Sequence, residues 1–358
     1  MKKIRIARAG GGTGGHVFPI KSLIAYLQTQ PQAQQIQQQY RFWSKASLEQ
    51  ETCAELQKTI TNLAFLPIQS GKLRREKSFW AWLKNGRDFF LFLIGFFQSL
   101  YFLIKYQIDL VFCKGGYVAL PVVLAAKVLW KKILVHESDV HPGLVNRIAG
   151  RFSTANFSGF PWVLPKTQVV GQILSDELIS SELSKKSSKQ TQVLVMWGSQ
   201  GSKNLYEALV KILRTEPQLQ EMQFTIILGK LNQELNQLFA SFSNVKTLDF
   251  VTQQEIGALY MQSDIAITRA GTTSLAEQEL FDLKLVMVPI PRTHDQLDNA
   301  KRYVKYKDWI LIQQDDPRFL PKLAQTLKSL IHYKKTLSSR DRKAEIAEAK
   351  KTIIAKLF

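Results

Sequence analysis

Two glycine-rich turns occupy corresponding places in the two halves of this 358-residue chain. Residues 10–15 follow the apolar run 4–9, and residues 198–202 follow the apolar run 193–197. Where a buried parallel strand passes into a helix, such a turn exposes backbone N–H groups at the positive end of the helix dipole, which suits phosphate. Glycine is needed because a side chain would hold the backbone away from its ligand. The duplication predicts two nucleotide-binding-type lobes that share a cleft.

Apolar runs alternate with helical stretches through both halves. Strands are expected at 4–9, 40–44, 110–113, 133–136 and 154–157, and then at 193–197, 224–228, 246–248, 265–268, 285–289 and 309–312. Helices of the first half are expected at 19–28, 48–58, 89–105 and 121–130, and residues 321–358 are expected to be helical. This alternation predicts βαβ units and hence a doubly wound parallel sheet in each half. The glutamine-rich run 28–39 is expected to be a helix tail or a solvated loop.

The chain is strongly basic, with a formal net charge of +19. Such a charge favours an anionic partner, whether phospholipid, phosphorylated substrate or nucleic acid. No recognition-helix or stacking motif supports nucleic acid. The two cysteines form neither a disulfide framework nor a metal-ligand cluster, which suits a reducing cytoplasm. The first residues run straight into a strand-like segment, so no cleavable signal peptide is expected.

Residues 89–104 are apolar enough to be compared with a membrane span. The run is shorter than the roughly 20 residues that a bilayer needs, and Gln98 and Ser99 interrupt it, so a transmembrane helix is not expected. Cations and large aromatic side chains precede it: Lys72, Arg74, Arg75, Phe79, Trp80 and Trp82. This composition is typical of a segment that lies in the headgroup layer of a membrane. The alternative is a core helix with a basic solvent face.

The first glycine turn has two functional interpretations. Its glycines satisfy the G-x-G-x-x-G pattern of dinucleotide-binding proteins, but no acidic residue follows before Glu49, which disfavours that interpretation. His16 ends the turn, where an imidazole is expected to point into the cleft and to accept a proton from a hydroxyl near neutral pH. A histidine that only hydrogen-bonds the loop or a phosphate is the alternative, and spacing does not decide between the two.

Three later segments also follow expected strands. Residues 271–274 suit phosphate binding at a helix N-terminus, and Glu277 is placed to take both hydroxyls of a ribose; the alternative is a capping box. Residues 291–300 are rich in side chains that suit a sugar's hydroxyls, or form a polar loop whose aspartate caps a helix. The acidic side chains of residues 136–146 are expected to accept hydrogen bonds rather than to hold a metal.

Six segments, in this order, resemble the MurG family of bacterial cell-wall glycosyltransferases over nearly the whole chain. They are GGTGGHVFP (11–19), GGYVALP (115–121), HESDVHPGLVNRIA (136–149), GSQGS (198–202), TRAGTTSLAE (268–277) and DQLDNA (295–300). The resemblance implies an α/β GT-B fold, with two Rossmann-like doubly wound domains and an interdomain cleft. Residues 1–165 would bind the acceptor and the membrane, 166–335 would bind UDP-GlcNAc, and 336–358 would form a helix packed back on the first domain.

The activity implied by the resemblance is inverting transfer of GlcNAc from UDP-GlcNAc to the MurNAc 4-hydroxyl of lipid I, which gives lipid II for peptidoglycan. Transfer of a UDP-sugar to another membrane lipid is the alternative, and an inactive membrane scaffold is a third. The implied partners are UDP-GlcNAc, lipid I, an anionic membrane surface and other proteins of cell-wall synthesis, without nucleic acid. The implied location is peripheral, on the cytoplasmic face of the cell membrane. No Asp-x-Asp motif is present, and no metal or other cofactor is expected.

The resemblance also implies roles for individual residues, with His16 as the candidate general base. The donor would contact Ser199, Gln200, Gly201, Phe250, Ile256, Gly271, Thr272, Thr273, Ser274, Glu277, Asp295 and Gln296. The acceptor would contact Thr13, Gly14, Gly15, His16, Gly115, Gly116, Tyr117, Asp139 and Asn146. Three positions depart from the family pattern: the linker arginine is missing from residues 171–175, Trp197 replaces a glycine, and Asp139 stands where many relatives have asparagine.

Overall fold

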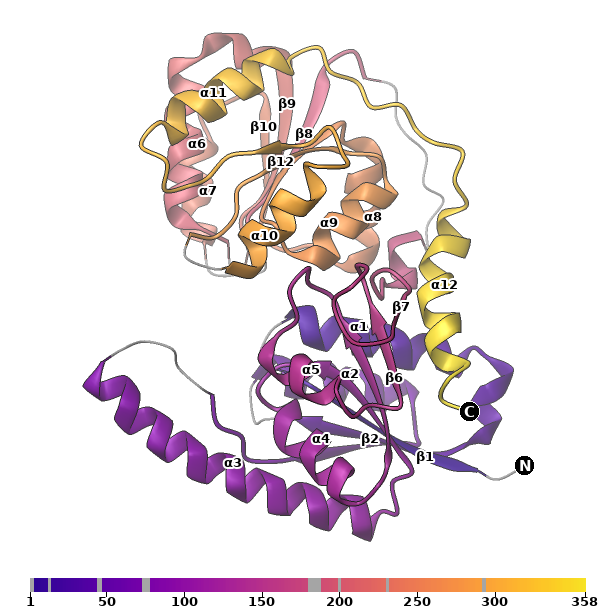
Figure 1. The fold of residues 1–358 in the computed structure, drawn as a ribbon. Coiled ribbons are helices and arrows are strands. Elements are labelled where there is room, and N and C mark those ends of the chain that lie inside the picture. Colours follow the sequence, from indigo (N-terminus) through magenta and orange to yellow (C-terminus); the bar gives the residue numbers. More distant parts are fainter. Residues whose placement is uncertain are drawn as a thin grey trace. The chain divides into compact units, whose positions relative to one another are not determined.

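The computed structural model describes residues 3–11, 14–43, 47–72, 78–179, 188–198, 201–229, 232–291 and 294–358. The chain divides into two compact units (Figure 1). The first comprises Met1–Leu174 together with Ile346–Phe358, and the second comprises Ser175–Glu345. Each unit contains one parallel sheet with helices on both faces.

The first unit is built on a seven-stranded sheet of order β3-β2-β1-β4-β5-β6-β7, in which every pairing is parallel. The strands are β1 (Ile4–Gly10), β2 (Ile36–Trp43), β3 (Leu63–Pro67), β4 (Leu110–Gly115), β5 (Lys132–Glu137), β6 (Ala155–Ser158) and β7 (Thr167–Val169). The helices are α1 (Gly14–Gln28), η1 (Pro31–Gln35), α2 (Ser47–Thr59), α3 (Phe79–Lys105), α4 (Ala119–Val128), α5 (Leu144–Ala149) and α12 (Arg342–Ile354).

Side chains of this sheet alternate between two apolar cores, because successive strand residues point to opposite faces. Ile6 packs with Ile20 of α1 and Ile353 of α12 on one face. Ala7 packs with Leu103 of α3 and with α4 on the other. The C-terminal helix α12 is therefore part of the core of the first unit.

The second unit repeats this plan with six strands in the order β10-β9-β8-β11-β12-β13, again all parallel. The strands are β8 (Thr191–Met196), β9 (Met222–Ile227), β10 (Val245–Leu248), β11 (Ile265–Thr268), β12 (Lys284–Met287) and β13 (Ile310–Leu311). The helices are η2 (Asp176–Ile179), α6 (Lys203–Thr215), η3 (Pro217–Glu221), η4 (Gln233–Leu235), α7 (Asn236–Phe239), α8 (Gln253–Gln262), α9 (Thr272–Leu280), α10 (His294–Tyr303) and α11 (Phe319–Ser329).

Strand order reverses between β1 and β4 in the first sheet and between β8 and β11 in the second. In open α/β sheets, ligands bind at the carboxyl ends of the strands beside such a switch point. The two glycine-rich turns follow β1 and β8, and residues 115–117 and 271–274 lie at the ends of β4 and β11. These four segments therefore lie at a switch point.

Several sequence expectations are wrong in detail. The glutamine-rich run forms η1 and the first half of β2 rather than a loop, and Gln39 is fully buried. Strands β3 and β7 were not expected. The two units divide at 174/175 and 345/346, whereas the expected boundaries are 165/166 and 335/336. The difference arises because β7 extends the first sheet, while Ser338 donates a hydrogen bond to Asp282 of the second unit and Arg340 forms an ion pair with it.

Helix α3 is also longer than expected, with 27 residues that begin at Phe79. By length and composition alone, Trp82–Lys105 suffices to cross a membrane, so the expectation that this segment is too short is wrong. The helix lies beside α4 (Figure 1). The segment after β3 also packs closely on this helix: a Cβ at Gly95 would lie 1.9 Å from the Gln69 carbonyl oxygen, so only glycine permits that contact.

Candidate functional site

In the first unit, His16 lies in the first turn of α1 and contacts the end of β4. Its Nδ1 is 3.1 Å from the carbonyl oxygen of Lys114. Because a carbonyl only accepts hydrogen bonds, Nδ1 carries the proton and Nε2 is the basic nitrogen. The ring is half-buried, and burial together with the charges of Lys114 and Arg41 lowers the pKa of His16 to about 4. At neutral pH the imidazole is therefore uncharged and able to accept a proton.

The first glycine turn packs directly on the turn that follows β4. Gly116 has a φ of +81°, and a Cβ there would lie 2.2 Å from the Gly11 carbonyl oxygen and 3.1 Å from Cδ2 of His16. Gly115 has a φ of +94° and packs against the side chain of Asn146. Three acceptor segments predicted from the sequence thus meet at one edge of the sheet, although Thr13 lies outside the described residues.

Substituting Gly116 by alanine is expected to destabilise the protein by about 3 kcal/mol, because a positive φ and a steric overlap both oppose a Cβ. Gly171→Ala is the matched control: it has the same φ of +81°, but nothing lies within 4 Å of its Cβ position. That variant is expected to lose about 1 kcal/mol. Urea unfolding of both variants measures the difference, and equal losses would show that the contact between the two turns is not tight.

The loop after β5 is held by Glu137. Its carboxylate accepts hydrogen bonds from the backbone N–H of Asp139 (2.9 Å) and of Gly143 (3.0 Å), and from Nδ2 of Asn146 (2.9 Å). Asn146 is 2% exposed and also donates to the His136 carbonyl. Its amide therefore holds the loop, and its expected contact with the acceptor stays a prediction. Asp139 and Tyr117 are half-buried, and Gly14 and Gly15 form the start of α1.

In the second unit, the second glycine turn packs on the end of β9. Gly201 has a φ of +69°, and a Cβ there would lie 2.5 Å from the Leu228 carbonyl oxygen. Helix α6 begins two residues later, so its N-terminal N–H groups lie next to the turn. Ser199 and Gln200, which were predicted to contact the donor, lie outside the described residues.

Glu277 is buried in α9, at 7% exposure, and accepts a hydrogen bond of 3.1 Å from the Tyr260 hydroxyl. The N-cap of α9 is Gly271, which makes no side-chain cap. The capping-box alternative is therefore wrong here; a capping box joins Thr252 and Glu255 in α8 instead. Burial raises the pKa of Glu277 to about 7. A buried carboxyl group that titrates near neutral pH is typical of a ligand-binding site.

The remaining donor residues predicted from sequence differ in exposure. Thr272, Thr273 and Ser274 form the first turn of α9, with Thr272 buried. The Ile256 side chain belongs to the interior, because the residue is only 5% exposed. Its backbone N–H donates a hydrogen bond to the Thr252 carbonyl. Three further residues lie nearer the surface: Phe250, which is 61% exposed, the exposed Asp295, and Gln296, whose Oε1 accepts from the N–H of Ile290.

Arg269 was not predicted as a functional residue, although it lies in the TRAGTTSLAE segment (268–277). Its Nη1 donates to the carbonyl oxygens of Val288 (3.0 Å) and Pro289 (3.2 Å). Its guanidinium also lies 5.8 Å from the centre of the Trp197 ring. The residue thereby fixes the ends of β8, β11 and β12 to one another. Sequence offered one signal: a charged residue directly after a buried strand.

The membrane residues predicted from sequence belong to helix α3 of the first unit and to the residues before it. Phe79, Trp80 and Trp82 are 68–71% exposed on α3, and Lys72 is exposed before it. Arg74 and Arg75 lie outside the described residues.

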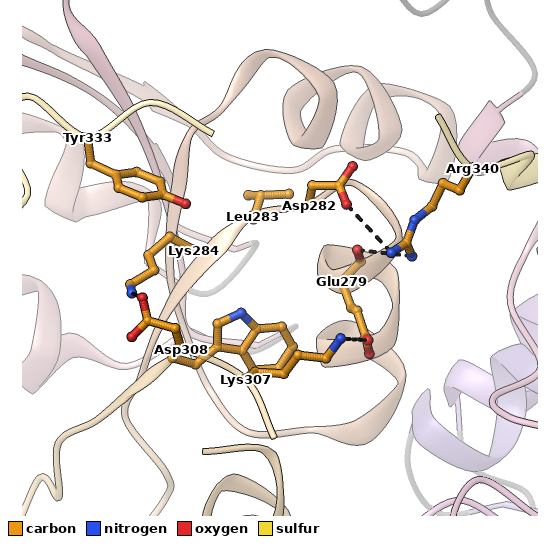
Figure 2. A pocket seen from close by; sticks show the side chains of 9 residues that line it. Glu279, Asp282, Leu283, Lys284, Lys307, Asp308, Tyr333 and Arg340 are labelled. Atoms are coloured by element: carbon orange, nitrogen blue, oxygen red, sulfur yellow. Dashed lines mark hydrogen bonds and ion pairs between the residues drawn. The ribbon is translucent and has the colours of Figure 1, made fainter. Parts of the chain in front are cut away.

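A cavity of about 220 Å³ in the second unit lies at the amino end of β12, the opposite edge from the glycine turn (Figure 2). Its charged side chains are paired with one another: Lys284 with Asp308, Lys307 with Glu279, and Arg340 with Asp282. Because these charges neutralise each other, the cavity offers little attraction to an anionic ligand.

Both units match known protein domains. Residues 6–158 match the glycosyltransferase family 28 N-terminal domain, and residues 192–357 match the C-terminal domain of that family. The chain is 31% identical over 315 residues to the UDP-N-acetylglucosamine–N-acetylmuramyl-(pentapeptide) pyrophosphoryl-undecaprenol N-acetylglucosamine transferase of Staphylococcus carnosus, with 84% of this chain and 82% of the relative covered. A second transferase of that name, from Bacillus cereus, is 29% identical over 99% of this chain and 98% of its own.

A crystal structure of Acinetobacter baumannii MurG superposes with a TM-score of 0.70 at 23% identity, over 99% of each chain. The fold is therefore GT-B, as the sequence resemblance implies. The sequence matches extend over both units and include the turns at both switch points. This chain belongs to glycosyltransferase family 28 and is homologous to its MurG members.

Proposed function

We propose that this glycosyltransferase moves GlcNAc from UDP-GlcNAc to the 4-hydroxyl of MurNAc in lipid I, with inversion at the anomeric carbon. The observation that carries the proposal is the pair of glycine-containing turns at the switch point of each sheet. The activity for which relatives at about 30% identity are named supports the choice of both substrates.

The donor is assigned to the second unit. Displacement of UDP builds negative charge on the diphosphate, and N–H groups at the N-termini of α6 and α9 are suited to stabilise it. Glu277 would accept hydrogen bonds from both ribose hydroxyls, while Asp295 and Gln296 would contact the hydroxyls of GlcNAc. We propose that these helix ends stabilise the leaving diphosphate in the way that a divalent metal does in transferases with an Asp-x-Asp motif.

The acceptor is assigned to the first unit. The turns that contain Gly14, Gly15, Gly115 and Gly116 would bind the diphosphate of the lipid-linked acceptor through their N–H groups. Nε2 of His16 would take the proton from the 4-hydroxyl as the oxygen attacks the anomeric carbon of GlcNAc. The bond from that carbon to the diphosphate breaks, and UDP leaves.

A direct assay tests the proposal. The purified protein is incubated with radiolabelled UDP-GlcNAc and a short-chain lipid I analogue, with UDP-GalNAc as the donor control and diacylglycerol as the acceptor control. Label is expected in the lipid I analogue alone and from UDP-GlcNAc alone, with or without EDTA. Label in diacylglycerol would favour the alternative acceptor, and loss of activity in EDTA would contradict the metal-free mechanism.

We further propose that α3 attaches the enzyme to the cytoplasmic face of the cell membrane as a peripheral protein. Exposed apolar side chains follow one another along the helix: Phe79, Trp80, Trp82, Phe89, Phe90, Ile94, Phe97, Tyr101 and Ile104. Buried Ser99 and Leu103 lie on the face packed into the unit. The net charge of +19 complements anionic lipid.

Substituting both Trp80 and Phe90 by glutamate is expected to weaken binding to phosphatidylglycerol vesicles at least about tenfold, because each side chain loses about 1.5 kcal/mol or more of apolar burial. Tyr306→Glu, at a 66% exposed aromatic residue of the second unit, is the control and should bind normally. Vesicle co-sedimentation measures both. Alkaline carbonate should release the wild-type protein from membranes; retention would indicate that α3 spans the bilayer.

A further inference from the structure

Two arginines lie side by side between the first sheet and α1. Arg8 of β1 and Arg41 of β2 are register partners on adjacent parallel strands, and both are fully buried. Ile6 packs with α1 on one face of the sheet, while Ala7 and Tyr40 pack on the other. Because strand side chains alternate, Arg8 and Arg41 both lie on the face that α1 covers.

A third cation joins them from β4. Lys114 is 1% exposed, and its Cβ lies 3.0 Å from the position that a Cβ would occupy on Gly10. Its Nζ donates to the Ser138 hydroxyl at 2.5 Å, and Nη2 of Arg41 donates to the Gly10 carbonyl at 2.7 Å. The Arg41 side chain therefore reaches the start of the first glycine turn, and the Lys114 side chain passes beside Gly10 to the loop after β5.

Arg8 has no acceptor for its charge among the residues that the structure describes. None of its three guanidinium nitrogens has a hydrogen-bond partner within those parts of the chain. Burial lowers the pKa of Arg8 to about 9, so the group remains charged at neutral pH. A buried charge without a counterion is unfavourable, and it becomes favourable when an anion is held nearby.

We propose that Arg8, Arg41 and Lys114 form a buried cationic layer that attracts a diphosphate group to the first glycine turn. This inference rests on the proposed function, in which that turn takes the diphosphate of the acceptor. The layer acts through its field, while the N–H groups of the turn make the contacts. Because the three cations are buried, solvent screens them less than surface lysines.

Thermal unfolding with inorganic pyrophosphate tests the layer, in the presence of saturating UDP to occupy the second unit. Wild-type protein is expected to gain stability with pyrophosphate. Arg8→Met is expected to be more stable than wild type without pyrophosphate, because an uncompensated buried charge is gone, and to bind pyrophosphate at least about tenfold more weakly. Arg8→Lys keeps the charge and should keep the pyrophosphate response.

Arg5→Met is the matched control, because it removes the same charge from the opposite end of β1, where the guanidinium donates to Gln107. It should respond to pyrophosphate as wild type does. An Arg8→Met protein that is destabilised yet binds pyrophosphate normally would overturn the proposal and leave Arg8 a structural role. Should Arg8→Met fail to fold, Arg41→Met and Lys114→Met make the same test of the pyrophosphate response.

Two further outcomes separate this inference from the proposed function. Wild-type protein that is stabilised by UDP but not by pyrophosphate would overturn the cationic layer and leave the donor assignment standing. Protein that responds to pyrophosphate but not to UDP would overturn the donor assignment, and it would support the layer only if Arg8→Met loses that response. Binding to phosphatidylglycerol vesicles should be the same for Arg8→Met and wild type; a loss would overturn the proposal in favour of a lipid headgroup.

Discussion

Substituting His16 by alanine is expected to lower kcat by about 10²- to 10⁴-fold, the usual contribution of a general base. The Kd for UDP-GlcNAc should change little, since the donor is assigned to the other unit. The structural reason is the 3.1 Å contact between Nδ1 and the Lys114 carbonyl, which fixes the tautomer and leaves Nε2 to accept the proton. Single-turnover kinetics and calorimetry with UDP-GlcNAc measure the two quantities separately.

The pH profile sharpens this test. With a pKa of about 4, His16 of the free protein is in its basic form down to mildly acidic pH. The kcat/KM of the wild-type protein should therefore lose its His16-dependent part only as the pH falls through about 4, because protonation removes the base. His332→Ala, at an exposed histidine of the second unit, is the control and should behave as wild type. Unchanged turnover in His16→Ala would exclude the residue as the base.

The low pKa of His16 also makes it a weak base. A general base works best when its pKa lies near the working pH. A base whose pKa lies well below neutral pH drives proton transfer less effectively. Burial and the charges of Lys114 and Arg41 cause this weakness, so a bound diphosphate would oppose it by adding negative charge nearby. The acceptor itself would then help to make His16 an effective base, which links the cationic layer to the chemistry.

The parts of the fold that sequence predicted are those with strong local signals. Strands β1, β4, β8 and β11 are short apolar runs with a glycine at the end of the run or within three residues after it, so their type and approximate end were predictable. Strand β3 (LAFLP) is only five residues long, and its run is too short for periodicity to distinguish strand from helix. The start of β2 is rich in glutamine, and this polar composition does not indicate a strand. Pairing within the sheet makes it one.

The site residues that sequence missed act through partners distant in the chain. Arg269 binds carbonyl groups 19 and 20 residues away, and the Arg8 and Arg41 pair is created by strand register. No local sequence pattern indicates that two residues so far apart in the chain are in contact. Glu277, by contrast, was predicted from its place one turn into a helix, but its contact with Tyr260 and its raised pKa follow from packing.

Substituting Glu277 by glutamine is expected to weaken UDP binding by about 10- to 100-fold, because hydrogen bonds to a charged group contribute about 1.5–3 kcal/mol each. In the proposed site the ionised carboxylate would accept both ribose hydroxyls, so the affinity of the wild-type protein for UDP should fall as the pH drops below about 7. The glutamine variant should lack that dependence. Glu279→Gln, which lies on the same helix and pairs with Lys307, is the matched control.

The stability of the folded protein gives an independent readout of the same group. The pKa of Glu277 is raised from 4.5 to about 7, so the folded protein binds this proton more tightly than the unfolded chain. The resulting stability is fully present below pH 4.5 and is lost as the pH rises through 7. At 1.36 kcal/mol per pKa unit, the loss is about 3 kcal/mol. Urea unfolding should show that the free energy of unfolding of Glu277→Gln rises relative to that of the wild-type protein by about this amount between pH 4.5 and 8.

A double-mutant cycle then distinguishes a ribose contact from a general effect on the site. If Glu277 binds the ribose hydroxyls, removing the 2′-hydroxyl from UDP and removing the carboxylate delete the same interaction, so the two losses are not additive. 2′-Deoxy-UDP should therefore bind Glu277→Gln almost as well as UDP does, although it binds the wild-type protein more weakly. Additive losses would mean that the ribose is held elsewhere and that Glu277 is only a buried group whose pKa is raised by desolvation.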